Sequence, residues 1–223
     1  MAEVQDSKEA FRSALFWSLV IVGAISLIFV FESALGMSWY WLGVNPRAWA
    51  GLLGILTSPV KHHDIGHLLN NMLLLEILLV GYYLHVPTKQ PLRKLLLISL
   101  IANLWLWIGG RDAWHYGASG VVYGLFFYLL VVSIKGRIKE LYLFVFSCLL
   151  LSAGFFIGLF PVEETVSFEG HLFGSLSGIM VALSEKRIKK KKVPASNVTL
   201  TRDASFHYQY KENKDKQGTT KNR

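Results

Sequence analysis

Six long apolar runs dominate the sequence and constrain the fold more than any other feature. They span residues 14–36, 66–84, 93–108, 119–134, 140–160 and 171–185. A helix of about 20 apolar residues crosses a hydrocarbon core of roughly 30 Å. With 52% hydrophobic and only 17% charged residues, the chain is too apolar for an ordinary soluble domain. We therefore expect an all-α membrane protein with a bundle of six transmembrane helices.

Lysine and arginine residues are distributed unevenly between the connections of these runs. On one side of the membrane, the expected connections hold 14 lysine and arginine residues; these connections are 1–13, 85–94, 135–139 and 186–192. The opposite connections hold only 3 and are residues 37–65, 109–118 and 161–170. Because positive residues favour the cytoplasmic side, we expect both termini in the cytoplasm. The net charge of +8 then reflects topology, and no nucleic-acid partner is expected.

The same pattern divides the chain into three parts. We expect a cytoplasmic N-terminal segment (1–13), one six-helix domain (14–185) and a basic, disordered cytoplasmic tail (186–223). Little positive charge precedes the first apolar run, so we expect that run to be an uncleaved helix rather than a signal peptide. The first loop (37–65) is rich in tryptophan, which favours the membrane–water interface.

Three short polar motifs lie at the starts of the second, fourth and sixth runs. They are His67-x-x-x-Asn71, Gly117-Ala118-Ser119-Gly120, and Gly170-His171 followed by Gly174. If the helices alternate in direction, all three motifs lie on the same side of the membrane at a similar depth. Polar groups at such depth are costly and usually functional. A serine, a histidine and an Asn/His pair together are the layout of a hydrolytic site.

Glycine spacing predicts that the fourth and sixth helices pack together. The glycines that recur every four residues are Gly120 and Gly124 in the fourth run and Gly170, Gly174 and Gly178 in the sixth. Small residues at this spacing let two backbones approach closely. On its own the spacing indicates only a tight helix pair. However, Ser119 and His171 lie beside these glycines, both roughly 22–24 Å from the basic cytoplasmic edge, which favours a shared site.

The chemistry of these side chains suggests their roles. His171 is the candidate base that takes the proton of Ser119 and later delivers it to a leaving amine. His67 and Asn71 share one helix face and can donate hydrogen bonds to an oxyanion, as can the free N–H groups where the helix of Ser119 begins. His62 either joins this polar network or lies at the interface.

No acidic residue is obviously placed to orient the base. Glu169 and Asp64 are expected to be solvated near the outer surface. A Ser–His dyad is therefore the simpler interpretation than a triad. Two other classes remain open. His63-Asp64-x-x-His67 has the i, i+4 histidine spacing of a zinc motif, without a clear third ligand. The polar groups could alternatively line the path of a transporter or the site of a binding protein.

Residues 14–185 resemble the rhomboid intramembrane serine proteases. In that family the nucleophile lies in a G-x-S-G motif that opens the fourth helix, and the base is a histidine at the start of the sixth. The resemblance implies Ser119 and His171 as catalytic residues, and His67 and Asn71 as the oxyanion hole. It also implies supporting residues, namely His62, Gly117, Gly120, Tyr123, Gly174 and Gly178, with Tyr123 packed on the histidine.

The resemblance further implies an activity and a location. The expected function is hydrolysis of peptide bonds in or near the transmembrane segments of membrane-protein substrates, which enter sideways from the lipid bilayer. The expected enzyme needs no cofactor and no metal, and it is a multi-pass protein of the cell membrane, most simply a prokaryotic plasma membrane. One departure is the first loop, where many rhomboids carry a Trp-Arg pair. Arg47-Ala48-Trp49 is no clear substitute for it.

Overall fold

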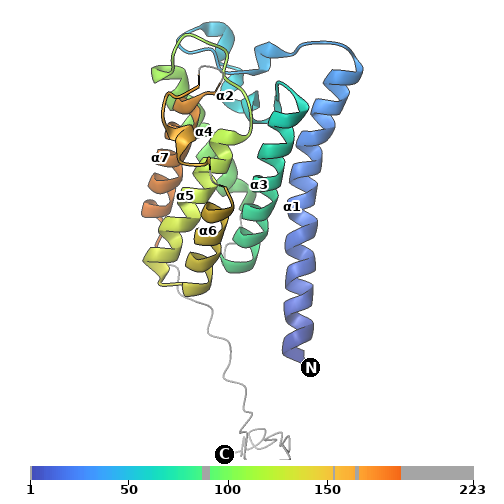
Figure 1. The fold of residues 1–223 in the computed structure, drawn as a ribbon, viewed down its shortest axis with the longest axis vertical. Helices are drawn as coiled ribbons and strands as arrows, with labels where there is room; N and C mark the ends of the chain where they lie inside the picture. Colours follow the sequence, from blue (N-terminus) through green and yellow to red (C-terminus); the bar gives the residue numbers. More distant parts are fainter. Residues whose placement is uncertain (1, 87–90, 153, 164–165, 187–223) are drawn as a thin grey trace, which may run out of the picture. The chain divides into compact units, whose positions relative to one another are not determined.

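The computed structural model describes residues 2–86, 91–152, 154–163 and 166–186 (Figure 1). The α-helices of this described part are α1 (Ala2–Ala34), α2 (Gly54–Thr57), α3 (Ile65–His85), α4 (Pro91–Gly109), α5 (Ser119–Gly136), α6 (Lys139–Leu151) and α7 (Phe168–Ser184). Short 3-10 helices are η1 (Tyr40–Leu42), η2 (Trp49–Gly51), η3 (Ser58–Val60) and η4 (Ile157–Leu159). Over these residues there is no β-strand, only one isolated bridge. The all-α prediction is confirmed for this part of the chain.

Within the described ranges, four helices are long and apolar enough to cross a membrane. They are Ser7–Ala34 within α1, Ile65–His85, Leu92–Gly109 within α4, and Ser119–Gly136. The helices α6 and α7 have 13 and 17 residues, which corresponds to about 20 and 26 Å. Four of the six expected crossings therefore have the required length and composition. Crossing by α6 and α7, and the cytoplasmic location of both termini, stay predictions.

Two helix boundaries differ from the sequence-based expectation. The first helix begins at Ala2, so no break separates residues 2–13 from the apolar run. Good helix formers such as Glu, Lys and Ala explain this continuation. The fifth run was expected to be helical over 140–160, but α6 ends at Leu151 and Ser152 has a non-helical backbone. The expected tail lies outside the described residues from position 187 onward.

Side-chain caps fix where two of the motif-bearing helices begin. Asp64 precedes α3, and its carboxylate accepts the backbone N–H of His67 at 2.9 Å. Ser167 precedes α7, and its hydroxyl oxygen accepts the backbone N–H of Gly170 at 3.2 Å. Such caps satisfy N–H groups that have no partner within the helix. As a result, the His67 and His171 motifs occupy the first turns of their helices.

The central helix of the bundle is α5, which contacts α3, α4, α6 and α7. Its Leu125, Tyr128 and Leu129 are fully buried. Near its end, the Lys135 ammonium donates hydrogen bonds to the carbonyl oxygens of Ala182 (2.9 Å) and Glu185 (2.7 Å). These carbonyls belong to the end of α7, which would otherwise leave them unpaired. Lys135 therefore holds α5 and α7 in register at the end opposite Ser119 and His171.

The helix α1 lies beside α3 (Figure 1). The hydroxyl of Ser18 donates a hydrogen bond of 2.6 Å to the Glu76 carboxylate on α3. At the C-terminal end of α1, Glu32 forms a buried ion pair of 2.8 Å with Lys61, just before α3. The sequence motifs gave no indication of this buried pair. Because α1 is otherwise exposed along much of its length, these polar contacts fix its position against α3.

The first loop is fixed to the end of α4. The backbone N–H of Arg47 donates to the carbonyl of Trp107 at 2.9 Å, and the Trp107 indole N–H donates to the carbonyl of Ala48 at 3.0 Å. Arg47 also adopts a left-handed backbone with φ of 59°. The Trp49 side chain is 87% exposed. An exposed tryptophan is consistent with an interfacial loop, which stays a prediction.

Candidate functional site

The loop that leads into α5 brings Gly117, two residues before Ser119, against α3. The N–H of Gly117 donates to the Ser58 carbonyl at 2.9 Å, and the N–H of Ala118 donates to Nε2 of His62 at 3.3 Å. Gly117 has φ of +120°, a backbone conformation that favours glycine. A Cβ at this position would lie 2.7 Å from the His67 ring. Glycine is therefore required both by the turn and by the close approach of α3.

His62 is a buried part of this loop's support. Its side chain has no exposed surface, and burial together with the nearby His67 lowers its pKa from 6.5 to about 4. The neutral ring accepts the Ala118 N–H through Nε2, so its proton resides on Nδ1. Of the two alternatives left open by the sequence, the structure places His62 within the polar network. Its ring contacts the His67 ring at a centroid distance of 5.1 Å.

His67 and Asn71 occupy one face of α3 beside Gly117. A Cβ on Gly117 would lie 2.9 Å from Nε2 of His67 and 3.6 Å from Nδ2 of Asn71. The Asn71 side chain is buried, and its Nδ2 has no hydrogen-bond partner among the described residues. An unsatisfied buried amide is unfavourable unless a ligand completes it. Asn71 therefore presents a donor close to the residues that precede Ser119.

His171 is held in one orientation by two neighbours, Gly158 and Tyr123. Its Nδ1 lies 2.8 Å from the carbonyl oxygen of Gly158. A carbonyl only accepts, so Nδ1 carries the proton and the neutral ring keeps Nε2 free to accept one. The Tyr123 ring stacks on the imidazole with a centroid distance of 4.2 Å and an interplanar angle of 8°. Phe155 stacks on the other face of Tyr123 at 4.0 Å, and its carbonyl accepts the Tyr123 hydroxyl at 2.5 Å.

The glycine stripes of α5 and α7 are in direct backbone contact. A Cβ on Gly174 would overlap the backbone of Gly120, and a Cβ on Gly178 would overlap that of Gly124. A Cβ on Gly120 would lie 3.2 Å from the carbonyl oxygen of Gly170. The expected packing of the two stripes is confirmed. Because Gly120 follows Ser119 and Gly170 precedes His171, the two motifs flank this contact.

The serine and the histidine are not hydrogen-bonded to each other within the described residues. Instead, half-buried Ser119 borders a small cavity of about 20 Å³, which is room for one water. The other polar side chains that line it are Ser58, Ser99, Asn103, His115, Tyr116 and Ser167. Hydrogen bonds of catalytic groups are often long before a substrate binds. The geometry thus brings the motifs together while leaving the Ser–His contact a prediction.

One expectation about charged residues was wrong. Glu169 is buried rather than solvated, because it pairs with Arg111 at 3.7 Å. His115, which the metal alternative would recruit together with His171, is 3% exposed and hydrogen-bonded to Ser167. Asp64 is exposed, as expected, and caps α3. Ser167 followed by Glu169 is the pattern of a capping residue and an acidic residue in the first turn, which indicates the start of a helix in the sequence.

The zinc-like spacing does not form a cluster of ligands in the described part of the chain. The His63 side chain is 72% exposed, and its ring nitrogen Nδ1 lies 3.3 Å from the carboxylate of the adjacent Asp64. Its ring stacks on Tyr116 at 6.4 Å, whereas His67 faces the Gly117 turn. No group of three His, Cys, Asp or Glu side chains within the described ranges could hold a metal ion.

Comparison with known proteins yields one family. The rhomboid domain profile matches residues 47–187, more than half of the chain. An uncharacterized protein of Mycobacterium tuberculosis (strain H37Rv) is 27% identical over 156 residues, covering 63% of this chain and 62% of that protein. One from Mycobacterium bovis matches equally, and one from Mycobacterium leprae is 29% identical over 149 residues, covering 59% and 55%. The chain spans about three fifths of the length of these curated relatives.

Proposed function

The chain belongs to the rhomboid family, and on this premise we propose that it is an intramembrane serine endopeptidase with Ser119 and His171 as its dyad. Rhomboid proteins are generally intramembrane serine proteases. The observation that carries the assignment to these two residues is the backbone contact between Gly120 and Gly174. It joins the first turn of α5, where the serine lies, to the turn of α7 that follows the histidine.

In the proposed reaction, Ser119 Oγ attacks the carbonyl carbon of the scissile peptide bond. His171 Nε2 accepts the serine proton, because Nδ1 is already engaged with Gly158. The tetrahedral intermediate then collapses, His171 delivers the proton to the leaving amine, and an acyl-enzyme remains. Water hydrolyses this ester in a second round in which His171 again acts as base and acid. No step requires a cofactor.

The negative oxygen of the tetrahedral intermediate is proposed to bind between α3 and the start of α5. Asn71 contributes its unpartnered Nδ2, and His67 contributes a ring nitrogen beside the same turn. The backbone N–H of Ser119, at the N-terminal end of α5, adds a third donor and the favourable end of the helix dipole. Donors fixed in advance are the main source of oxyanion stabilisation.

The remaining residues of the site have supporting roles in this proposal. His62 and Gly117 shape the turn before Ser119, and Tyr123 orients the imidazole. The glycines of α5 and α7, Gly120, Gly174 and Gly178, allow the helix contact. The proposed substrates are membrane proteins whose transmembrane segments enter from the lipid bilayer and unwind locally. We place the enzyme in a cell membrane as a multi-pass protein, with both termini cytoplasmic.

The experiment is cleavage of a tagged transmembrane reporter by the purified protein in proteoliposomes. Ser119→Ala and His171→Ala should each abolish cleavage. Ser147→Ala is a matched control, because this serine on α6 bonds only within its own helix and should leave cleavage unchanged. Full cleavage by Ser119→Ala would reject the nucleophile. Cleavage that persists in Ser119→Ala but is lost on chelation would favour the metal alternative instead.

A further inference from the structure

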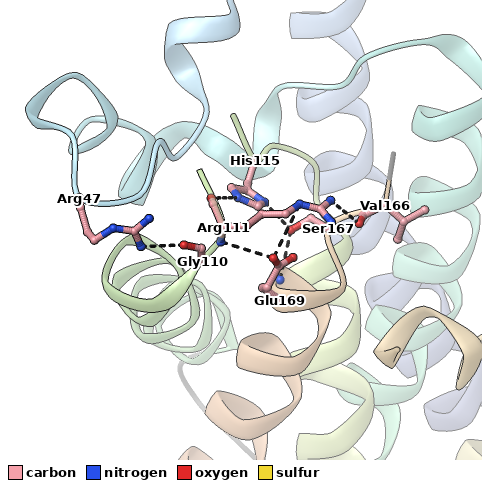
Figure 2. A network of polar contacts seen from close by, with 8 residues as sticks. Arg47, Gly110, Arg111, His115, Val166, Ser167 and Glu169 are labelled. Carbon is pink, nitrogen blue, oxygen red and sulfur yellow. Dashed lines mark hydrogen bonds and ion pairs between the residues drawn. The ribbon is translucent and has the colours of Figure 1, made fainter. Parts of the chain in front are cut away.

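A second polar cluster connects the loop before Ser119 with the residues before His171 (Figure 2). We call it the loop–helix clamp and define it by Arg111, His115, Ser167 and Glu169. Arg111 and His115 belong to the loop between α4 and α5, while Ser167 and Glu169 form the beginning of α7. The two halves are more than 50 residues apart in sequence. The proposed chemistry assigns no role to any of these four side chains.

The first contact of the clamp is made by Arg111. Its backbone N–H donates to Oε1 of Glu169 at 3.4 Å, and its Nε lies 3.7 Å from the same oxygen. Its Nη2 donates to the Val166 carbonyl at 2.8 Å. The Glu169 side chain is only 9% exposed, and its Oε2 has no hydrogen-bond partner in the described part of the chain. Arg111 is thus the cation that compensates a buried carboxylate, and such a pair is sensitive to loss of either partner.

The second contact is a directional chain of hydrogen bonds through His115. Its Nε2 lies 3.0 Å from the Arg111 carbonyl, which can only accept, so Nε2 carries the proton. Nδ1 therefore accepts from the Ser167 hydroxyl at 2.7 Å. The Ser167 oxygen in turn accepts the N–H of Gly170 at 3.2 Å. Burial lowers the pKa of His115, which keeps the ring in this neutral, directional form.

The clamp has a defined place relative to the candidate dyad. His115 lies four residues before Ser119, and Glu169 lies two residues before His171. His115 and Ser167 also border the cavity beside Ser119. The Gly120–Gly174 contact fixes how closely α5 and α7 approach each other, but it does not fix the loop that precedes Ser119. That loop is held on one side by His62 and Ser58, and on the other by the clamp.

We propose that Arg111 and Glu169 are positioning residues whose ion pair sets the location of Ser119 relative to His171. This inference rests on the proposed function, because it assigns a task to the pair in that reaction. Catalytic groups displaced by about 1 Å lose roughly 10²-fold in rate. A pair that joins the two catalytic segments directly is therefore expected to affect the chemical step. It should affect substrate binding much less, since neither side chain belongs to the proposed oxyanion hole.

The test compares five variants with the wild type in the reporter assay, with kcat and KM measured separately. Glu169→Ala and Arg111→Met should each lower kcat by about 10²-fold with KM nearly unchanged. Glu169→Gln retains an acceptor for the Arg111 N–H and should lose less activity than Glu169→Ala. Combining Arg111→Met with Glu169→Ala should cost less than the sum of the two single changes, because the ion pair is already lost in each of them. Asp112→Asn is the matched control, because this substitution removes one charge from the same loop at an exposed residue next to Arg111.

A second readout does not depend on catalysis. Hydrogen exchange of the backbone amides between residues 111 and 119 should accelerate in Glu169→Ala and Arg111→Met, and not in Asp112→Asn. Wild-type kcat together with wild-type exchange in Glu169→Ala or Glu169→Gln would overturn the positioning role. Failure of the proposed function would look different, because cleavage by the wild type would then be absent or independent of Ser119. If Glu169→Ala does not fold, Glu169→Gln provides the decisive comparison.

Discussion

Replacing Gly174 with alanine should separate α5 from α7 at the level of Ser119. A Cβ on Gly174 would lie 2.9 Å from the carbonyl carbon and 3.0 Å from the Cα of Gly120, and would overlap its carbonyl oxygen. Ordinary contacts of this kind are 3.4–4 Å. The obstacle is backbone, so no side chain can rotate away, and the helices must separate by at least about 0.5 Å in an otherwise close-packed bundle.

The expected consequences are measurable in both stability and rate. Overpacking of this kind costs about 1–3 kcal/mol of unfolding free energy. Because Gly120 follows Ser119 directly, a shift approaching 1 Å should lower reporter cleavage by roughly 10²-fold. Thermal unfolding in detergent and the kcat of cleavage, measured on the same preparation, report the two effects.

Gly23→Ala supplies the matched control for this substitution. Gly23 also lies in a helix that is long and apolar enough to cross a membrane, but a Cβ there would meet no atom within 4 Å. Alanine is favoured over glycine inside a helix by about 0.5–1 kcal/mol, so this variant should be as stable as the wild type or slightly more so. Its cleavage rate should not change. Wild-type stability and wild-type cleavage in Gly174→Ala would refute the reasoning about the glycine contact.

Three further predictions follow from individual contacts. Asn71→Ala should lower kcat by about 10²-fold or more, because it removes an oxyanion donor. Its thermal stability should be nearly unchanged, because Nδ2 has no hydrogen-bond partner to lose in the described chain. An unchanged kcat would contradict the oxyanion assignment. The pKa of His62 is lowered to about 4 in the folded protein. Between pH 6.5 and 4, His62 is therefore protonated in the unfolded chain but neutral in the folded protein. Stability should therefore fall as the pH drops through this window, by a few kcal/mol in total, and thermal unfolding of His62→Gln should show a shallower pH dependence. Lys61→Met leaves Glu32 as an uncompensated buried charge and should lower the free energy of unfolding by about 3–5 kcal/mol, measured by thermal unfolding. Adding Glu32→Leu should restore part of this stability. Equal stability of the single and double variants would contradict the pairing.

Much of the site's arrangement follows from local sequence patterns. The four-residue spacing of Gly120 and Gly124 matches that of Gly174 and Gly178, and the structure joins these stripes backbone to backbone. The capping residues Asp64 and Ser167 precede their helices directly, so the starts of α3 and α7 could be located closely. Period, spacing and caps are properties of neighbouring residues, which a single sequence displays.

The charged partners could not be predicted in the same way. Glu169 was expected to be solvated, yet it is buried because Arg111, 58 positions away in sequence, lies against it. The same holds for Glu32 and Lys61, whose pairing depends on how α1 packs on α3. The charge of a residue is visible in the sequence, whereas its partner is determined by tertiary packing.

The end of α6 was misjudged for a different reason. The run over 140–160 is predominantly apolar, and hydropathy alone does not distinguish a helix from an apolar turn. The chain leaves the helix at Ser152 and forms η4, whose Gly158 carbonyl then accepts from His171. The segment expected to be the end of a helix thus supplies a contact that orients the candidate base.

The most direct test of the account is to locate the adduct formed with a serine-reactive fluorophosphonate by mass spectrometry. The account predicts a single covalent adduct on Ser119, formed by the wild type and by Ser147→Ala. In His171→Ala the rate of adduct formation should fall by at least about 10²-fold, because the serine loses the base that activates it. An adduct on another residue, or labelling of Ser119 at the wild-type rate without His171, would contradict the proposed dyad.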